Sequence, residues 1–310
     1  LLWFDTSLDM FIKNCFPNAG VGLSRFALSS QLASFDESLQ SNFESLKYLN
    51  LSNNLLSNLS DFPLAKFPNL ESLDLSKNRL HTINGLNSLV NLKFLNLSSA
   101  NYYSFNSRWL ESLVIDNLSN LKNLQSLDLS NNGIAEIKNL SSLSSLKSLN
   151  LSHNVLIKSI ENLSSLKNLQ ILKLVNTNIS KIENLSELSS LRILDLSSNS
   201  ITKLQNLNNL NSLSNLILKN NYISTIDLSE ILNLKKLEII DISKSKISNI
   251  EFTPFDYSNH YNRLFPNLKA FYIDSIDSNS LPKTIIKEFK INKNYKTTLK
   301  NSSAIKVCVY

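Results

Sequence analysis

The stretch Leu124-Gln125-Ser126-Leu127-Asp128-Leu129-Ser130-Asn131-Asn132 contains the pattern that decides how this chain folds. Apolar and polar residues alternate in its centre, as they do in a β-strand that buries one face, so Leu127 and Leu129 are expected to point inward. The closing Asn132 can turn the chain out of the strand. Its side-chain amide can also bond backbone groups of neighbouring turns that no strand pairing would satisfy. The stretch therefore predicts a short strand followed by a buried asparagine.

The same pattern, Leu-x-x-Leu-x-Leu-x-x-Asn, recurs along most of the chain. Three copies have Ala100, Thr177 or Ser245 in place of the asparagine, and the last of these has Ile240 and Ile242 in place of two leucines. Copies begin at Leu46, Leu70, Leu92, Leu124, Leu146, Leu169, Leu191, Leu213 and Leu237, and degenerate copies begin at Leu23 and Leu268. The copies from Leu124 to Leu213 start 22 or 23 residues apart. A fixed period of this length indicates a repeat protein in which no single repeat buries its own apolar faces. Each copy is expected to add one strand to a parallel sheet, about 4.8 Å from the strand before it.

Apolar residues after each strand predict how the chain returns to the core. Ile134 and Ile137 follow the asparagine of their repeat, and equivalent pairs follow in later repeats. Leu140, Leu143 and Leu146 then recur at every third position, which is typical of a short 3₁₀ or helical segment. The pattern as a whole predicts an α/β solenoid, with a curved parallel sheet on the concave side and short 3₁₀ or helical segments on the convex side.

These repeats resemble the leucine-rich-repeat family. The 22-residue period with Asn-x-Ile-x-x-Ile is similar to the repeats of the leucine-rich regulatory subunit of protein phosphatase 1 and of bacterial internalins. The segment 261–274, with Tyr261, Pro266, Leu268 and Asp274, resembles the C-terminal cap of intracellular eukaryotic members, which include spindle-pole and centrosomal scaffolds. The expected organisation is an N-terminal cap or stub over 1–22, about eleven repeats over 23–274 with an insertion near 100–112 and a C-terminal cap over 251–274, and a Lys-rich extension over 275–310.

The net charge of +6 comes from one end of the chain. Residues 281–310 hold seven lysines and one acidic residue, Glu288, and 7 − 1 = +6 accounts for the whole surplus. A neutral body does not have the basic face of a dedicated nucleic-acid binder, although the basic tail leaves a contact with RNA open.

The composition also excludes several kinds of site. With four glycines, the chain lacks the material for a phosphate loop as well as the turns of a compact enzyme. The two cysteines, Cys15 and Cys308, lie at opposite ends, and the three histidines lie in different repeats. No apolar run reaches the length of a membrane span. The expectation is a non-enzyme without cofactor or metal. Cysteine usage favours the cytoplasm or nucleus. The resemblance to spindle-pole and centrosomal members implies a spindle pole or centrosome there, and the alternative is the cell surface.

Outward-facing positions of the strands predict where a partner would bind. In the N-terminal half they are mostly Ser, Asn and Asp, whereas the C-terminal half has apolar residues with charged neighbours. The candidates are Ile171, Val175, Ile193, Ile217 and Ile239, with Lys173, Asp195, Lys219 and Asp241 around them. An apolar patch with a charged rim is typical of a protein interface. The alternative is that isoleucine suits a strand whichever way it faces.

Aromatic residues in the N-terminal half give a second set of candidates. Phe94 lies at an outward strand position, and the insertion contains Tyr102, Tyr103 and Phe105. Insertions in solenoids are often placed on the binding side, and tyrosine is favoured at interfaces. Trp109 and Leu110 instead have helical spacing with later apolar residues, which favours a structural role.

The expected function is a non-catalytic protein–protein interaction module or scaffold that docks a partner on its concave face. The family resemblance implies a partner such as a phosphatase catalytic subunit or a signalling or cytoskeletal protein, and a regulatory role in the cell cycle. The serines in most outward columns depart from the acidic and aromatic surface of the phosphatase regulator. The alternative is a secreted or cell-surface adhesin of the internalin type.

Overall fold

A computed structural model describes residues 25–27, 43–59, 64–100, 112–251, 266–274 and 304–308. The chain divides into two compact units, unit 1 (Leu1–Asn154) and unit 2 (Val155–Tyr310). The predicted boundary segment 1–22 and most of the insertion near 100–112 lie outside the described residues, as does most of the predicted extension 275–310.

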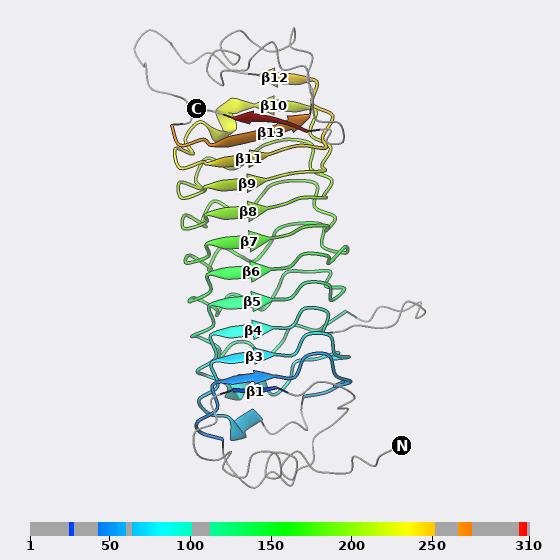
Figure 1. Cartoon of the computed structure of the whole chain (residues 1–310), viewed down its shortest axis with the longest axis vertical. Coiled ribbons are helices and arrows are strands. Elements are labelled where there is room, and N and C mark those ends of the chain that lie inside the picture. Colours follow the sequence, from blue (N-terminus) through cyan, green and yellow to red (C-terminus); the bar gives the residue numbers. More distant parts are fainter. Residues whose placement is uncertain are drawn as a thin grey trace. The chain divides into compact units, whose positions relative to one another are not determined.

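Unit 1 contains a ladder of short parallel strands (Figure 1). The strands are β1 (Arg25–Ala27), β2 (Tyr48–Asn50), β3 (Ser72–Asp74), β4 (Phe94–Asn96), β5 (Ser126–Asp128) and β6 (Ser148–Asn150). Each pairs with the next in chain order, with equivalent repeat positions opposite one another, such as Leu73 opposite Leu95. The strand predicted from the quoted stretch is therefore confirmed as β5.

Unit 2 continues the same architecture. Its parallel strands are β7 (Ile171–Lys173), β8 (Ile193–Asp195), β9 (Asn215–Ile217), β11 (Ile239–Asp241) and β13 (Ala270–Asp274). A separate parallel pair is formed by β10 (Thr225–Asp227) and β12 (Asn249–Glu251). Part of the predicted C-terminal extension forms β14 (Ala304–Cys308), which pairs antiparallel with β13. Together the units hold a strand at each of the eleven positions that the repeats predict, which confirms the solenoid fold.

Leucine and isoleucine side chains fill the core in every described repeat. In the strands from β2 to β11, the central residue is buried and its neighbours are partly or fully exposed, as in β5 with Leu127 between Ser126 and Asp128. In β13 the buried residues are Ala270, Phe271 and Ile273, and Tyr272 is partly exposed. The leucine after the strand and the following apolar pair are also buried, as are Leu129, Ile134 and Ile137. The alternation predicted from the sequence therefore sets which side of the sheet is the open face, the face that carries the outward-pointing strand residues.

The repeat asparagine is buried and bonds its neighbours as predicted. The amide of Asn154 donates to the carbonyls of Leu151 (2.8 Å) and Leu129 (3.0 Å). Its Oδ1 accepts from the backbone N–H groups of Asn132 (2.9 Å) and Ile134 (3.0 Å). One side chain thus satisfies four backbone groups in two successive repeats, and Asn78, Asn132, Asn199 and Asn221 make bonds of the same kind.

The return segments are built from 3₁₀-type turns. The N–H of Leu143 donates to the carbonyl of Leu140, and that of Leu146 donates to Leu143, each at 3.0 Å. Longer 3₁₀ helices are η1 (Leu64–Lys66), η2 (Leu86–Ser88) and η3 (Leu228–Ile231). Asp227 caps η3, because its carboxylate accepts from the N–H of Ser229 at 2.9 Å. In the described part of the chain, no helix is long and apolar enough to cross a membrane.

One turn in nine repeats, and a second turn in five of them, has a left-handed backbone, and asparagine holds most of these positions. The residue before the ladder position, which is asparagine in six of the repeats, has a positive φ in all nine: Asn53, Lys77, Ser99, Asn131, His153, Asn176, Ser198, Asn220 and Lys244. His153 therefore occupies a turn position (φ 62°), where its side chain is exposed. The second position is held by Asn117, Asn139, Asn162, Asn184 and Asn206. Asparagine tolerates this conformation better than most residues, which helps to explain its abundance.

Candidate functional site

A continuous row of apolar side chains crosses the open face of unit 2. We call it the apolar track and define it as Ile171, Ile193, Ile217, Ile239 and Tyr272. Ile171 on β7 lies directly opposite Ile193 on β8. Ile217 is a diagonal neighbour of both Ile193 and Ile239, because Asn215 of the same strand pairs with those two isoleucines. Tyr272 on β13 lies opposite Asp241 and diagonal to Ile239. Strand register alone therefore brings the predicted isoleucines together.

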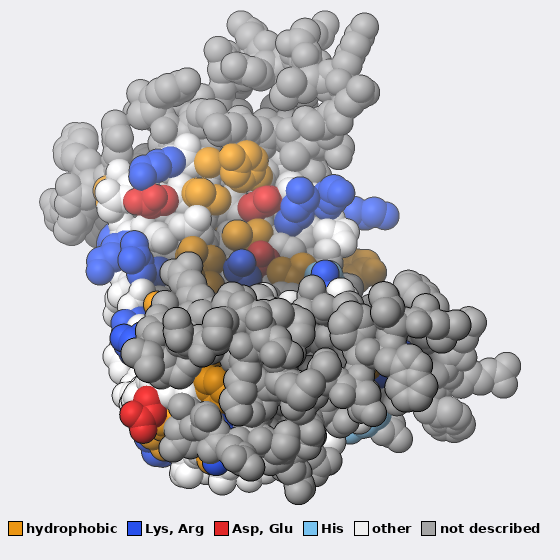
Figure 2. Space-filling view, turned by 60° about the horizontal axis from the view of Figure 1, so that its bottom comes forward, with side chains coloured by type: hydrophobic (Ala, Val, Ile, Leu, Met, Phe, Trp, Pro, Cys, Tyr) orange, Lys and Arg blue, Asp and Glu red, His pale blue; other side chains and the backbone are white. Residues whose placement is uncertain are grey.

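All five residues of the apolar track are partly exposed. Each strand turns its central leucine or its equivalent into the core, as with Leu172 and Leu194, so the flanking isoleucines have to face outward. Val175, another predicted site residue, is also partly exposed and lies beyond the end of β7. Partly exposed β-branched residues on neighbouring strands shield each other from water but leave apolar surface for a partner. Figure 2 shows hydrophobic side chains beside basic and acidic ones on the described surface.

Charged side chains of alternating sign accompany the apolar track. Lys173, Asp195 and Asp241 end β7, β8 and β11, and Lys219 lies two residues beyond the end of β9. Both lysines are exposed, and neither forms an ion pair within the described residues. Two positive and two negative charges cancel, so the predicted rim presents an alternating pattern without net charge.

The two aspartates of the track use one oxygen each to hold a turn. Asp195 Oδ1 accepts from the backbone N–H (3.0 Å) and hydroxyl (2.6 Å) of Ser197. Asp241 Oδ1 makes the same two bonds with Ser243. Among the described residues, no hydrogen bond reaches Oδ2 of either aspartate. That oxygen is therefore available to a donor from a partner.

Asp and Asn side chains on the open face of unit 1 form hydrogen bonds with one another and with the turns that follow the strands. Asp74 Oδ1 accepts from the N–H of Ser76 at 2.9 Å, and its Oδ2 accepts from the amide of Asn96 at 3.1 Å. Asp128 and Asn150 make the equivalent bond at 2.9 Å. The alternation of Asp and Asn along these strands therefore has a structural cause, since both carboxylate oxygens of Asp74 and of Asp128 accept hydrogen bonds within the unit.

The aromatic candidates are not part of the apolar track. Phe94 lies on β4 in unit 1 between Ser72 and Ser126, and 48% of its surface is exposed. Tyr48, which the sequence analysis did not select, shares this column and is 38% exposed. Tyr102, Tyr103 and Phe105 lie outside the described residues.

Sequence analysis also missed apolar residues outside the strands. Tyr222 is 70% exposed, and Val155 and Leu156 are about half exposed, at 51% and 48%. Tyr222 and Leu156 come directly before the buried Ile223 and Ile157, where other repeats have Asn178 or Ser200. A comparison of equivalent repeat positions between each strand and the following buried apolar pair would have found them. Tyr272 holds an outward strand position in the last repeat, but the sequence-based prediction did not group it with the isoleucines.

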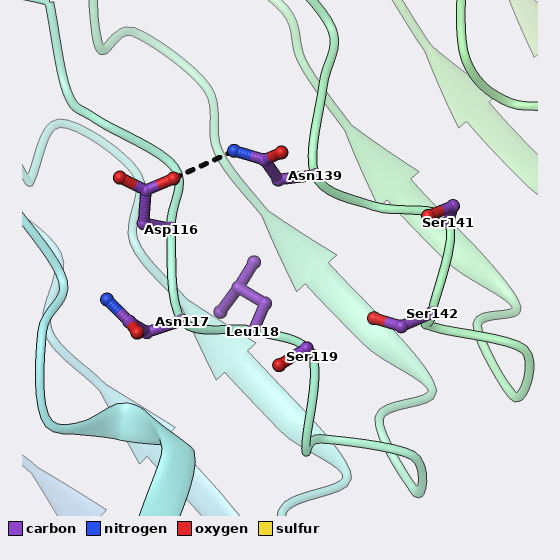
Figure 3. A pocket seen from close by; sticks show the side chains of 7 residues that line it. All are labelled: Asp116, Asn117, Leu118, Ser119, Asn139, Ser141 and Ser142. Carbon is purple, nitrogen blue, oxygen red and sulfur yellow. Dashed lines mark hydrogen bonds between the residues drawn. The ribbon is translucent and has the colours of Figure 1, made fainter.

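A shallow hollow lies away from the sheet in unit 1. It has a volume of about 440 Å³ and is lined by Asp116, Asn117, Leu118, Ser119, Asn139, Ser141 and Ser142. Figure 3 shows Asp116 and Asn139 pointing toward one another, and Asn139 Nδ2 donates to Asp116 Oδ1 at 2.8 Å. The same amide donates to the carbonyl of Ile115 at 2.7 Å. The one carboxylate of the hollow therefore takes part in holding a turn, and no second titratable group accompanies it there.

Ion pairs lower the pKa of two glutamates in the described part of the chain. Hydrogen bonds from the Lys93 and Lys47 ammonium groups lower the pKa of Glu71 below its ordinary value, with Nζ to carboxylate distances of 2.8 and 3.2 Å. An ion pair with Lys167 likewise lowers the pKa of Glu187. Within the described part of the chain, no group of three or more His, Cys, Asp or Glu side chains could hold a metal ion.

Comparison with known proteins identifies the repeats. Residues 42–203 match the family model described as leucine-rich repeat region. No curated protein sequence matches. A leucine-rich-repeat protein of Leptospira interrogans is similar in structure, with 26% identity, 81% of this chain and 59% of that chain covered, and a TM-score of 0.61. The chain thus spans less than two thirds of that protein.

Two further solved structures share the fold. TLR13, in a complex with the RNA ssRNA13, is 26% identical, with 79% of this chain and 39% of that chain covered and a TM-score of 0.57. The functional domain of InlJ from Listeria monocytogenes is 20% identical, with 86% of this chain and 56% of that chain covered and a TM-score of 0.59. At 20% identity, the similarity to InlJ shows a shared fold alone.

Proposed function

Because the chain belongs to the leucine-rich-repeat family, we propose that it is a protein-binding module that docks a partner protein on the apolar track of unit 2. One observation carries this proposal. The strand column that holds Ser72, Ser126 and Ser148 in unit 1 holds Ile171, Ile193 and Ile239 in unit 2. The fold needs only the buried leucines at its strand centres, so the exposed isoleucines are available for binding.

The charges around the apolar track support a protein partner rather than a nucleic acid. A phosphate backbone is bound by clustered cations, and each neutralised phosphate requires one. Here Asp195 and Asp241 alternate with Lys173 and Lys219, so a chain of phosphates would meet repulsion at every second strand. A protein surface can carry matching charges of both signs around an apolar centre. TLR13 is bound to RNA in its complex, but this face of unit 2 favours a protein.

For the finer assignment we propose an intracellular scaffold in the cytoplasm or nucleus, of the kind that phosphatase regulators and spindle-pole or centrosomal proteins represent. The cap-like sequence 261–274 supports this assignment. The 22-residue period supports a second candidate, a cell-surface recognition protein of the internalin type. Fractionation of cells that express the complete gene with a tag would separate the two, because a surface protein would leave the cytoplasmic and nuclear fractions.

Affinity capture from the native source tests the proposal. The wild-type chain is compared with the variant Ile171→Asp/Ile193→Asp/Ile217→Asp, which places three charges on the apolar track. The matched control, Ser72→Asp/Ser126→Asp/Ser148→Asp, places three charges on the open face of unit 1. Thermal unfolding of each variant first establishes that it is folded.

We expect the first variant to lose a set of partners that the wild type and the control both retain. Mass spectrometry of the captured proteins then identifies them. Retention of every partner by the folded Ile variant would show that binding does not use the apolar track, and the proposed function would be wrong.

A further inference from the structure

We infer that the segment of the partner seated on the apolar track is an amphipathic α-helix that lies across the strands and carries acidic and basic side chains that alternate along it. This inference rests on the proposed function and adds the shape and chemistry of the bound segment. Three features of unit 2 lead to it: the pairing of its strands, the length of the track, and the order of its charges.

The pairing of the strands excludes a bound segment that relies on the sheet for its hydrogen bonds. β8 is paired with β7 and β9, and β9 is paired with β8 and β11. The backbone N–H and C=O groups of these strands therefore bond neighbouring strands, and the open face presents only side chains to a partner. An extended peptide across the track would desolvate its own N–H and C=O groups against isoleucine, at a cost of about 1–3 kcal/mol for each unsatisfied group. A helix satisfies its backbone internally and avoids this cost.

The length of the apolar track suits a short helix. The track crosses five strands, β7, β8, β9, β11 and β13, which are separated by four steps of about 4.8 Å, or roughly 19 Å in all. A helix rises about 1.5 Å per residue, so about 13 residues cover this distance. Such a helix presents apolar residues at i, i+3 or i+4 and i+7 along one stripe, which can follow the zigzag from Ile193 through Ile217 to Ile239.

The charges around the apolar track lie within reach of a helix that is seated on it. Lys173, Asp195 and Asp241 end β7, β8 and β11, whereas Ile217 takes this position on β9 and Lys219 lies two residues further along the chain. Successive strands are about 4.8 Å apart, and side chains on one face of a helix recur about every 5.4 Å. A helix with acidic residues toward Lys173 and Lys219 and basic residues toward Asp195 and Asp241 would therefore meet opposite charges along its length, with the partner of Lys219 set to one side by about 7 Å. The Oδ2 atoms of the two aspartates provide acceptors for its basic residues.

Two display libraries test the shape and the charge pattern separately. The first is a three-helix bundle with the outer face of one helix randomised, and the second is a scaffold that presents a randomised extended segment of the same length. Both are sorted for clones that bind the full chain but not its Ile193→Asp variant. Ser126→Asp, at the same column of unit 1, is the matched control that every selected clone should still bind.

Selected clones are then measured against two charge variants. Lys173→Glu/Lys219→Glu reverses the lysines. Asp195→Asn/Asp241→Asn removes the negative charges but keeps the Oδ1 acceptor, as Asn96 and Asn150 do at the same strand position in unit 1. We expect the helical library to give track-dependent binders with acidic residues opposite the lysines. Reversal of the lysines should weaken them at least tenfold, and exchange of the binder's two acidic residues for lysine should restore the affinity.

The outcomes separate this inference from the proposed function. Track-dependent binders from the extended library alone would overturn the helix and leave the protein-binding surface intact. Helical binders that are indifferent to reversal of the lysines would overturn the charge pattern and with it the inference. If neither library gives a clone that distinguishes wild type from Ile193→Asp, the proposed binding surface itself fails.

Discussion

Each buried ladder asparagine joins its repeat to the one before it. Asn154 makes four hydrogen bonds to backbone groups, and none of its surface is exposed. We expect Asn154→Ala to leave two buried carbonyls and two buried N–H groups without this partner, and to lower the free energy of unfolding by about 3 kcal/mol or more. Urea denaturation followed by circular dichroism measures the change.

The control for this variant is Asn123→Ala. Asn123 is exposed and makes one bond, from Nδ2 to the carbonyl of Val90 at 3.0 Å, so its loss should cost no more than about 1 kcal/mol. Equal decreases in the free energy of unfolding of the two variants would contradict the stabilising role of the buried asparagines.

The burial of Asn154 could be predicted from the repeat pattern. The Asp–Asn pairing on the open face could not, because it depends on which residues the register places opposite one another.

At the scale of strands and their flanks, Glu71 links three successive repeats of unit 1. It precedes β3 and lies between Lys47, which precedes β2, and Lys93, which precedes β4. Because both lysines stabilise the carboxylate, the pKa of Glu71 is lower in the folded state than in the unfolded chain. The stabilisation is therefore complete above the unfolded pKa and disappears as the pH falls through the folded pKa.

We expect Glu71→Gln to lower the thermal midpoint at pH 7 and to match the wild type at an acidic pH below the folded pKa, where the carboxylate is protonated in the folded and the unfolded chain. Thermal scans at the two pH values, with and without about 1 M salt, measure this, since salt should also reduce the difference at pH 7. Lys138→Gln is the control, because its pair with Glu136 lies within one repeat. A difference between wild type and Glu71→Gln that persists unchanged at low pH would contradict the ion-pair explanation.

The positions of the repeat strands could be predicted, since alternation and period together leave one register in which every leucine is buried. The strands are shorter than the alternation, because β5 ends at Asp128, before the buried Leu129. The apolar track was predicted in part from the same alternation. Tyr272 escaped because it lies in a degenerate repeat, and Tyr222 and Leu156 escaped because the pattern does not specify residues between the ladder asparagine and the next buried isoleucine. Exposed residues at equivalent positions of different repeats can be compared from the sequence. Which side chains lie beside them depends on the fold.

At the scale of the whole molecule, a sheet of parallel strands has to end without leaving an open edge. In unit 2 the far edge of β13 is covered by β14, which pairs with it over five residues, Ala270–Asp274 opposite Ala304–Cys308. The sequence indicated only a basic extension here, because a closing antiparallel strand does not follow the repeat pattern. Uncovered strand edges are templates for pairing with another chain.

We therefore expect a chain that ends at Asp274 to keep its folded circular dichroism spectrum but to self-associate, so that size-exclusion chromatography with light scattering gives a dimer or larger species. The control retains β14 and replaces basic residues of the extension, in Lys287→Gln/Lys290→Gln/Lys293→Gln/Lys296→Gln. If the loss of β14 causes association, the control keeps the mass of the wild type. If the control associates as well, repulsion between the basic extensions, and not coverage of β13, keeps the chains apart. A truncated chain with the mass of the wild type would show that β14 is not needed to protect the edge.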